Sequence, residues 1–168
     1  MVLENQKWNR ILEVLFEYPE KKFTVRELAK RTKIPNSSVQ RYLTKLKNKN
    51  FVTKENQCSL NTHLKFVKAT FMINKMFSYG LIKHLEETLN PGVIIVFGSV
   101  RKGEYDHESD IDIFIETTKK IKVNLEKFEK KLNHKIQLFT KKRLTDLPQS
   151  LMNNVVNGIK VSGYTKIK

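Results

Sequence analysis

Residues 93–116 constrain the fold of this chain more than any other stretch. Five apolar residues, Val93 to Phe97, have the length and composition of a buried strand. Gly98-Ser99 then interrupts the strand at a point where a helix can begin. Ser109 to Ile115 alternate polar and apolar side chains, which is the pattern of a second strand with one buried face. We therefore expect two strands separated by a turn and a short loop.

This alternation places two carboxylates, Asp110 and Asp112, on one face of the second strand, because side chains at i and i+2 share a face. Their charges repel each other, which raises the pKa of at least one of them unless water, a basic partner or a divalent metal compensates. Carboxylate oxygens suit Mg²⁺, which proteins bind through one or two carboxylates together with substrate phosphates. The pair is therefore a candidate metal site.

The Gly98-Ser99 turn is a candidate phosphate-binding element. Glycine lets a backbone approach a ligand closely, and the N–H groups at a helix start attract anions. Metal-assisted phosphoryl or nucleotidyl transfer requires a phosphate-binding element beside metal-binding carboxylates, and this stretch offers both. The alternative is an ordinary turn before a polar strand edge. The joint agreement of turn, spacing and carboxylates argues against that alternative.

The combination of Gly98-Ser99, ten intervening residues and Asp110-x-Asp112 resembles the signature of the DNA polymerase β nucleotidyltransferase superfamily. It is most similar to the minimal nucleotidyltransferases of archaea and bacteria, over roughly residue 64 to the C-terminus. The resemblance implies that Asp110 and Asp112 are catalytic and hold Mg²⁺. It also implies a triphosphate site for ATP or another NTP, for which the expected binding residues are Gly98, Ser99, Arg101, Lys102 and Ser109.

The third carboxylate of this family is replaced here. In the family it usually lies on the strand after the next helix, and the matching segment, Lys135 to Phe139, carries Gln137 at that position. An amide brings no negative charge and is a poor base. Glu116 lies roughly 13 Å beyond Asp112 on an extended strand, too far to stand in. The remaining candidates near the pair are Glu104, Asp106, Glu108 and His134.

Two functions therefore stay open. In the first, the protein is an enzyme that transfers a nucleotidyl group, AMP from ATP, to an acceptor. Some minimal nucleotidyltransferases with this motif are antitoxins that modify a HEPN toxin, so the resemblance implies a protein hydroxyl as acceptor. In the second, Gln137 marks a weakened or inactive site. The protein is then a DNA-binding transcriptional regulator whose transferase-like domain senses nucleotide or contacts a partner.

Residues 1–62 are predicted to form a winged helix-turn-helix. Apolar residues recur at helical spacing from Trp8 to Phe16, and Thr24 to Glu27 form a capping-box pattern that starts a second helix. Asn36-Ser37-Ser38 can cap a third helix, and residues 51–60 suggest a short hairpin. Three helices followed by a hairpin resemble the winged helix-turn-helix, in which the third helix enters the major groove of duplex DNA.

The outer face of this third helix is polar and basic. We expect Gln40 and Arg41 to read base edges, Ser37, Ser38 and Lys45 to hold phosphates, and Lys54 to lie on or near the wing. The alternatives are a merely solvated helix face, or a winged helix used for dimerisation or protein docking.

The charge of the chain fits a polyanionic partner. There are 32 Lys+Arg against 17 Asp+Glu, a formal net charge of +15, and such an excess favours nucleic acid or nucleotides. Residues 1–60 carry 13 basic and 6 acidic side chains, and residues 61–168 carry 19 and 11. The excess is therefore shared, and a basic patch confined to one module is not indicated.

Residues 63–168 are expected to form a small mixed-sheet α/β unit, which makes the whole chain α+β. Residues 63–90 read as a connecting helix, kinked around Ser78 to Gly80. Its apolar side chains lie on more than one face, which indicates burial on several sides, either within the chain or in a homodimer. Helical spacing from Ile121 to Leu132, a strand at 135–139, a helix around 151–156 and a strand at 159–164 follow.

The single cysteine, Cys58, excludes an intramolecular disulfide and a cysteine-based metal site. The sequence opens with no secretory pattern and contains no apolar run long enough to span a bilayer. We therefore expect a cytoplasmic protein without a membrane partner.

Overall fold

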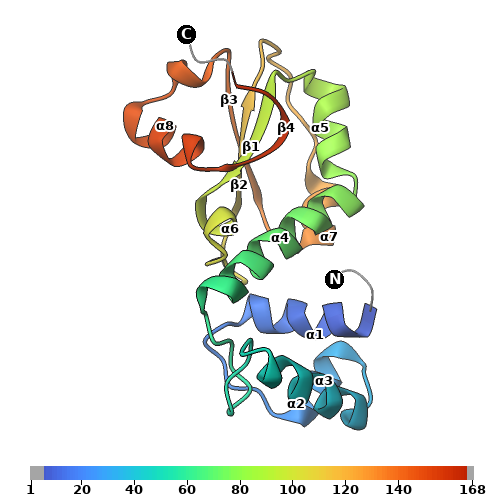
Figure 1. Ribbon diagram of the computed structural model, residues 1–168. Coiled ribbons are helices and arrows are strands. Elements are labelled where there is room, and N and C mark those ends of the chain that lie inside the picture. The colour runs from blue at the N-terminus through green and yellow to red at the C-terminus, as the bar shows by residue number, and fades with distance from the viewer. Residues whose placement is uncertain (1–5, 166–168) are drawn as a thin grey trace. The chain divides into compact units, whose positions relative to one another are not determined.

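The structure is a computed structural model that describes residues 6–165, and the chain divides into two compact units, Met1–Lys68 and Ala69–Lys168 (Figure 1). Helix α4 (Thr62–Ser78) runs across this division. The elements are helices around a mixed sheet, so the expected α+β class is confirmed.

The N-terminal unit contains the three expected helices, α1 (Gln6–Glu17), α2 (Val25–Thr32) and α3 (Asn36–Asn48). Their apolar stripes meet in one core, where the rings of Trp8 and Tyr42 pack edge-on with their centroids 5.9 Å apart. The packing follows from the 3.6-residue period, which puts each helix's apolar side chains on one face. The core residues include Ile11, Leu12, Leu15, Phe16, Leu28, Val39, Leu43 and Leu46.

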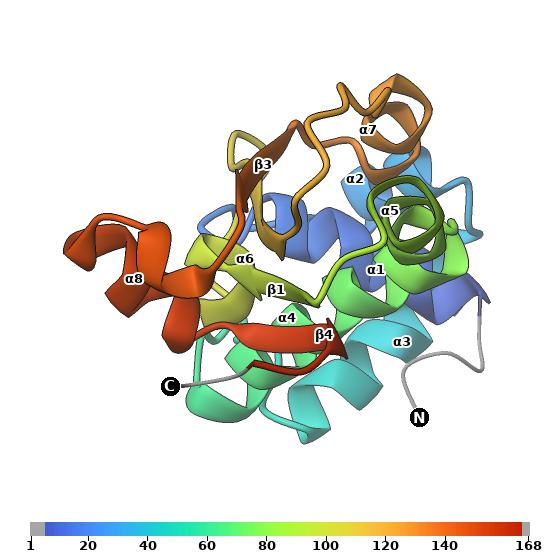
Figure 2. The ribbon, with the colours of Figure 1, turned by 90° about the horizontal axis from the view of Figure 1, so that it is seen from above.

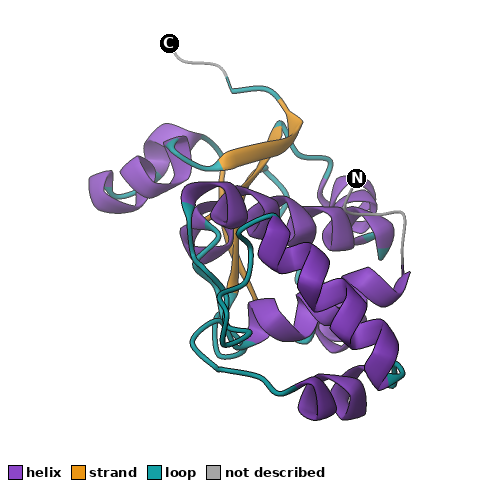
Figure 3. Cartoon of the chain, turned by 60° about the horizontal axis from the view of Figure 1, so that its bottom comes forward, coloured by secondary structure: helices purple, strands orange, loops and turns teal. Residues whose placement is uncertain are grey.

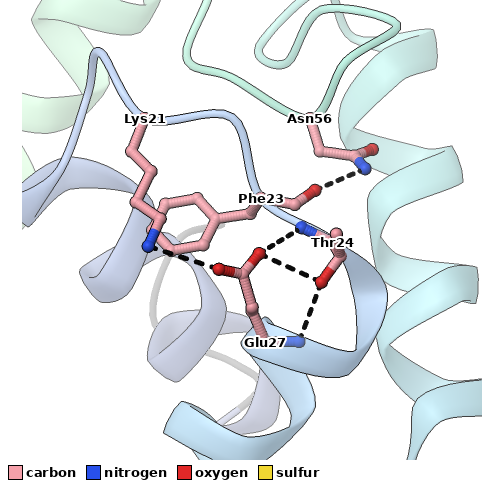
Figure 4. Close-up of polar contacts among 5 residues, drawn as sticks. All are labelled: Lys21, Phe23, Thr24, Glu27 and Asn56. Carbon is pink, nitrogen blue, oxygen red and sulfur yellow. Dashed lines mark hydrogen bonds and ion pairs between the residues drawn. The ribbon is translucent and has the colours of Figure 1, made fainter.

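The start of α2 is the predicted capping box (Figure 4). The Glu27 backbone N–H donates to the Thr24 hydroxyl at 3.1 Å, and the Thr24 backbone N–H donates to the Glu27 carboxylate at 2.8 Å. These bonds satisfy two backbone donors that a helix start would otherwise leave unpaired. They also lower the pKa of Glu27, with the backbone bond from Thr24 as the largest cause. Lys33 ends the helix in the left-handed conformation.

The start of α3 differs from the prediction. Its N-cap is Pro35, and no side chain caps the helix, so the expected cap by Asn36-Ser37-Ser38 is wrong. The Pro35 carbonyl already accepts the first helical bond, from the Val39 N–H at 3.0 Å. Proline fixes the extended entry into the helix, which moves the boundary one residue earlier.

The hairpin that follows α3 is very short. Its only bridge between strands, among the described residues, pairs Val52 with Cys58. The turn between them is closed by the Thr53 N–H, which donates to the Gln57 carbonyl at 2.8 Å. The side chain of Asn56 donates to the Phe23 carbonyl at 2.8 Å and so ties the turn to the segment before α2 (Figure 4).

The C-terminal unit is built on a four-stranded sheet in the order β3-β2-β1-β4. Figure 3 shows that the regular strands gather in this one sheet. Strand β1 (Val93–Phe97) pairs antiparallel with β2 (Ile111–Glu116) on one side and with β4 (Ile159–Gly163) on the other. Strand β3 (Ile136–Lys141) pairs parallel with β2. The remaining elements are α5 (Leu81–Leu89), α6 (Gly98–Lys102), α7 (Glu126–Leu132), the 3₁₀ turn η1 (Leu144–Asp146) and α8 (Gln149–Val156).

Both faces of this sheet are covered. Figures 1 and 2 show α8 on one side of the sheet and α5 with α7 on the other. On the α8 side, Val155 and Leu144 pack against Ile95, Phe97 and other strand residues in one apolar cluster. Burial on both faces explains why β1 reads as an unbroken apolar run, and all five of its residues are buried.

Two helical expectations need correction in this unit. The helix expected from Ile121 begins only at Glu126, and the Ile121 side chain is 54% exposed, because residues 117–125 form a loop. The kink expected around Ser78 to Gly80 is a full break between α4 and α5. Gly80 has a φ of +78°, a conformation that glycine adopts without strain.

Candidate active site

Asp112 lies near the start of β2, an inner strand of the sheet. On β2 it is paired with Phe97 of β1 on one side and with Gln137 of β3 on the other, and Asp110 immediately precedes β2. The pKa of Asp112 is raised, first by partial burial and then by the negative charge of Asp110. The repulsion expected from the alternating sequence is therefore present in the folded protein.

The Gly98 turn packs directly against this carboxylate. Gly98 has a φ of +68°, and a Cβ added to it would lie 2.1 Å from Oδ2 of Asp112. No side chain other than hydrogen fits there, so the end of β1 and the carboxylate of β2 form one continuous surface. Helix α6 begins at Gly98 and ends at Lys102, and its C-cap Gly103 is left-handed. The structure therefore brings the predicted turn and carboxylate together.

Gln137 occupies the position expected for the third carboxylate. Its side-chain amide donates a hydrogen bond of 2.5 Å to Oδ2 of Asp110. Within residues 6–165, no Lys, Arg or His side chain forms an ion pair with Asp110 or Asp112. The same residues contain no cluster of three or more His, Cys, Asp or Glu side chains arranged to hold a metal ion. The site is thus two carboxylates and one amide.

A pocket of about 420 Å³ opens beside Asp112. One part of its lining comes from the end of β1 and from α6, where Arg101 and Lys102 are exposed. Another part comes from α8 and the residue after it. This second part is neutral and polar, and sequence reasoning missed it, although Asn153 and Asn157 have the i, i+4 spacing of one helix face. The pocket is lined by Phe97, Gly98, Ser99, Arg101, Lys102, Glu104, Asp112, Asn153, Asn154 and Asn157.

Ser109 lies elsewhere. Its hydroxyl donates to Oδ1 of Asp106 at 2.9 Å and accepts from the Asp106 backbone N–H at 3.0 Å. The hydroxyl bond is the largest cause of a lowered pKa for Asp106. Ser109 lines a second pocket, of about 550 Å³, which also contains Asp110 but not Gly98 or Asp112. The predicted nucleotide contacts are therefore split between two pockets.

The other acidic and basic candidates have structural partners. Glu116 accepts a hydrogen bond from the Leu144 N–H at 2.9 Å and so anchors η1. His134 is buried, its Nδ1–H donates to the Ser109 carbonyl at 2.7 Å, and its ring packs edge-on against Tyr105. His134 therefore holds the loop before Asp110 against the start of β3.

In the N-terminal unit, the predicted DNA-reading residues share one helix. Ser37, Gln40, Arg41 and Lys45 are exposed on α3, and Ser38 is half-buried. Lys54 is exposed on the turn of the hairpin, and its carbonyl accepts a hydrogen bond from Nζ of Lys47 on α3 at 2.9 Å. That bond fixes the hairpin to the helix. The same arrangement leaves the basic face of α3 open.

Comparison with known families agrees with both units. Residues 79–161 match the family model of the nucleotidyltransferase domain. Residues 10–69 match the family model described as the sugar-specific transcriptional regulator TrmB. The chain thus carries a nucleotidyltransferase domain behind an N-terminal winged-helix domain of the TrmB type, a DNA-binding regulator domain.

Searches of curated proteins and of solved structures gave no match. Among residues 6–165, every helix is too short or too polar to cross a membrane.

Proposed function

We propose that the C-terminal unit binds a nucleoside triphosphate with Mg²⁺ and transfers its nucleotidyl group, AMP from ATP, to an acceptor. The observation that carries this proposal is the contact between Gly98 and Asp112, which brings the turn and one carboxylate of the pair together. Arg101 and Lys102 add positive charge to the same pocket. A triphosphate is the ligand that needs a close backbone, cations and a metal-binding carboxylate together.

The donor set fits Mg²⁺. Asp110 and Asp112 offer hard oxygen ligands. Burial, and then the negative charge of Asp110, raise the pKa of Asp112, and a bound cation would offset both effects. We assign both carboxylates as ligands, with Gln137 holding Asp110 in place. When bound, a divalent cation neutralises charge on the phosphates of the nucleotide.

The transfer itself needs an acceptor oxygen that attacks the α-phosphorus. The bond from the α-phosphorus to the bridging oxygen then breaks, and pyrophosphate leaves. Gln137 is a poor base, so we assign the acceptor's proton to solvent water. Arg101 and Lys102 hold the departing pyrophosphate through its negative charge. The acceptor we propose is a protein hydroxyl, as in antitoxins that modify HEPN toxins.

The N-terminal unit gives the protein a second activity in this proposal, which is binding to duplex DNA through α3. Arg41→Ala together with Lys45→Ala should weaken binding and reduce its dependence on salt. A protein with fewer cationic side chains at the DNA displaces fewer counterions when it binds. The matched control is Lys120→Ala with Lys122→Ala, which removes the same charge from an exposed loop of the other unit. Equal salt dependence in both double variants would contradict this assignment.

A second candidate function rests on the hydrogen bond between Gln137 and Asp110. An amide in this position lowers the charge available to metal, so the site can bind nucleotide without turnover. The protein is then a DNA-binding regulator that senses a nucleotide.

One experiment separates these functions. ATP is titrated calorimetrically into the full chain with and without Mg²⁺, and transfer of labelled AMP is followed with candidate acceptor proteins. Mg²⁺-dependent binding with transfer supports the enzyme, and binding without transfer supports the sensor. Asp110→Asn should abolish both signals, whereas Glu87→Gln, an exposed carboxylate of α5, should change neither. Full activity of Asp110→Asn would refute the proposed site.

A further inference from the structure

The pocket beside Asp112 has two chemically different parts. One part carries charge, with Arg101 and Lys102 on α6 and the carboxylates of Glu104 and Asp112 in the same lining. The part from α8 and the residue after it presents only neutral amides, from Asn153, Asn154 and Asn157. Phosphates and metal account for the first part. The second part carries no positive charge to bind a triphosphate, so its amides are better suited to hydrogen-bond an uncharged polar group of a ligand.

The amides are open for binding. Within residues 6–165, the side chains of Asn153 and Asn154 make no hydrogen bond. The Asn157 amide N–H donates to the Asn153 carbonyl at 2.8 Å, which fixes its side chain and leaves its oxygen as an acceptor. The three residues therefore supply both donors and acceptors to one pocket.

The backbone that carries these amides is held firmly against the sheet. Val155 is fully buried in the apolar cluster with Ile95 and Phe97. A Cβ added to Gly158 would lie 2.4 Å from Cγ2 of Ile95 and 2.8 Å from the Val96 carbonyl oxygen. The end of α8 therefore cannot shift away from β1 without breaking this packing. Side chains on such a support bind with little ordering cost.

We propose that Asn153, Asn154 and Asn157 bind the nucleoside part of the nucleotide and select adenine. This inference rests on the proposed nucleotide site. An amide pairs with the N6 amino group and N7 of adenine through one acceptor and one donor. Guanine presents two acceptors at the same edge and usually takes arginine or lysine. The arginine and lysine of this pocket lie on α6, and α8 carries neither.

The test is a calorimetric comparison of three probes with the full chain in the presence of Mg²⁺, namely ATP, GTP and inorganic tripolyphosphate. The variant is Asn153→Ala with Asn154→Ala. Alanine is the stronger helix former, so α8 should remain folded. The matched control is Gln149→Ala with Ser150→Ala, two exposed positions of α8 outside the pocket.

We expect the wild type to bind ATP about tenfold more tightly than GTP, as one or two net hydrogen bonds allow. The variant should lose that preference and about tenfold in ATP affinity, while its tripolyphosphate affinity stays unchanged. The control should match the wild type for all three probes.

Four results would overturn the inference. Unchanged ATP affinity in the variant would show that the amides do not contact the nucleotide, and equal losses for ATP and tripolyphosphate would place them on the phosphates. A wild type that binds tripolyphosphate as tightly as ATP would leave the phosphate site standing and remove the nucleoside site. A wild type that binds none of the probes would refute the proposed function as well, which separates the two failures.

Discussion

The side-chain amide of Gln137 donates a hydrogen bond to the carboxylate of Asp110 across the parallel pair of strands β3 and β2. Residue 137, the position expected to carry a third carboxylate, is therefore paired with Asp112 in the sheet, and its side chain contacts Asp110. What differs is one functional group at the end of a side chain. The site can be altered by substitution there without a change in the fold.

Gln137→Glu should strengthen Mg²⁺ binding by about tenfold or more, since one further unit charge a few ångströms from the cation contributes more than about 1.4 kcal/mol. Without metal, the same change should lower the melting temperature, because three carboxylates then repel one another. Calorimetric titration of Mg²⁺ and thermal unfolding with and without Mg²⁺ measure these two effects.

The control for this variant is Thr140→Glu. Thr140 is an exposed residue of β3, three positions after Gln137, so its side chain lies on the opposite face of the sheet. It adds the same charge to the same strand on the other face. An equal gain in Mg²⁺ affinity for both variants would mean that general electrostatics, and not the carboxylate site, binds the metal.

Gly98→Ala should abolish Mg²⁺-dependent nucleotide binding. Its Cβ would lie 2.1 Å from Oδ2 of Asp112, so the carboxylate or the turn must move. Gly80→Ala is a matched control, because Gly80 has a φ of +78° but open space around its Cβ position. Both variants carry the left-handed backbone penalty of about 1–2 kcal/mol. Only Gly98→Ala should lose binding, and retained affinity in that variant would contradict the close packing.

Ser109→Ala should destabilise the protein relative to the wild type, and this loss of stability should be larger at neutral pH than at low pH. The Ser109 hydroxyl holds the pKa of Asp106 below its ordinary value. The stabilisation is therefore complete above the unfolded pKa of about 3.9 and is lost as the pH falls through the lower folded pKa. Urea unfolding at several pH values between 2 and 7 measures the difference, which should shrink toward acid. A difference independent of pH would show that the hydroxyl acts only on the backbone.

Thr24→Ala should destabilise the N-terminal unit by about 1 kcal/mol, because it removes the side-chain half of the capping box. Trp8 is the only tryptophan and packs in the core of this unit, so its fluorescence follows the unfolding of the unit. Thr44→Ala is the control, since the Thr44 hydroxyl only donates to the Gln40 carbonyl inside α3. Equal destabilisation by both substitutions would argue against the cap.

The parts of this fold that sequence predicted well are those fixed by local physics. The unbroken apolar run of β1 and the capping box at Thr24 depend on a few neighbouring residues. The predicted start of α3 was wrong by one residue. The sequence suggested a side-chain cap at Asn36-Ser37-Ser38, whereas the N-cap is Pro35 and these polar residues lie inside the helix. The helical spacing of apolar residues begins at Ile121, but the helix begins only at Glu126. The spacing alone therefore placed the start of this helix too early.

The candidate site was predictable only in part. The turn at Gly98 and the carboxylate of Asp112 belong to neighbouring strands, so strand pairing alone brings them together. Asn153 and Asn154 reach the same pocket through packing of α8 on the sheet, which no local pattern encodes. Ser109 looked like part of the motif, yet its hydroxyl is used within its own loop.

The register that places residue 137 beside Asp112 also bears on how such a site can evolve. Codons for glutamine and glutamate differ only in their first base, so a single base substitution exchanges the amide for a carboxylate. A lineage can therefore give up or regain the third carboxylate without rebuilding the sheet. Gly98 has no comparable freedom, because every other residue type carries a Cβ that would meet Asp112.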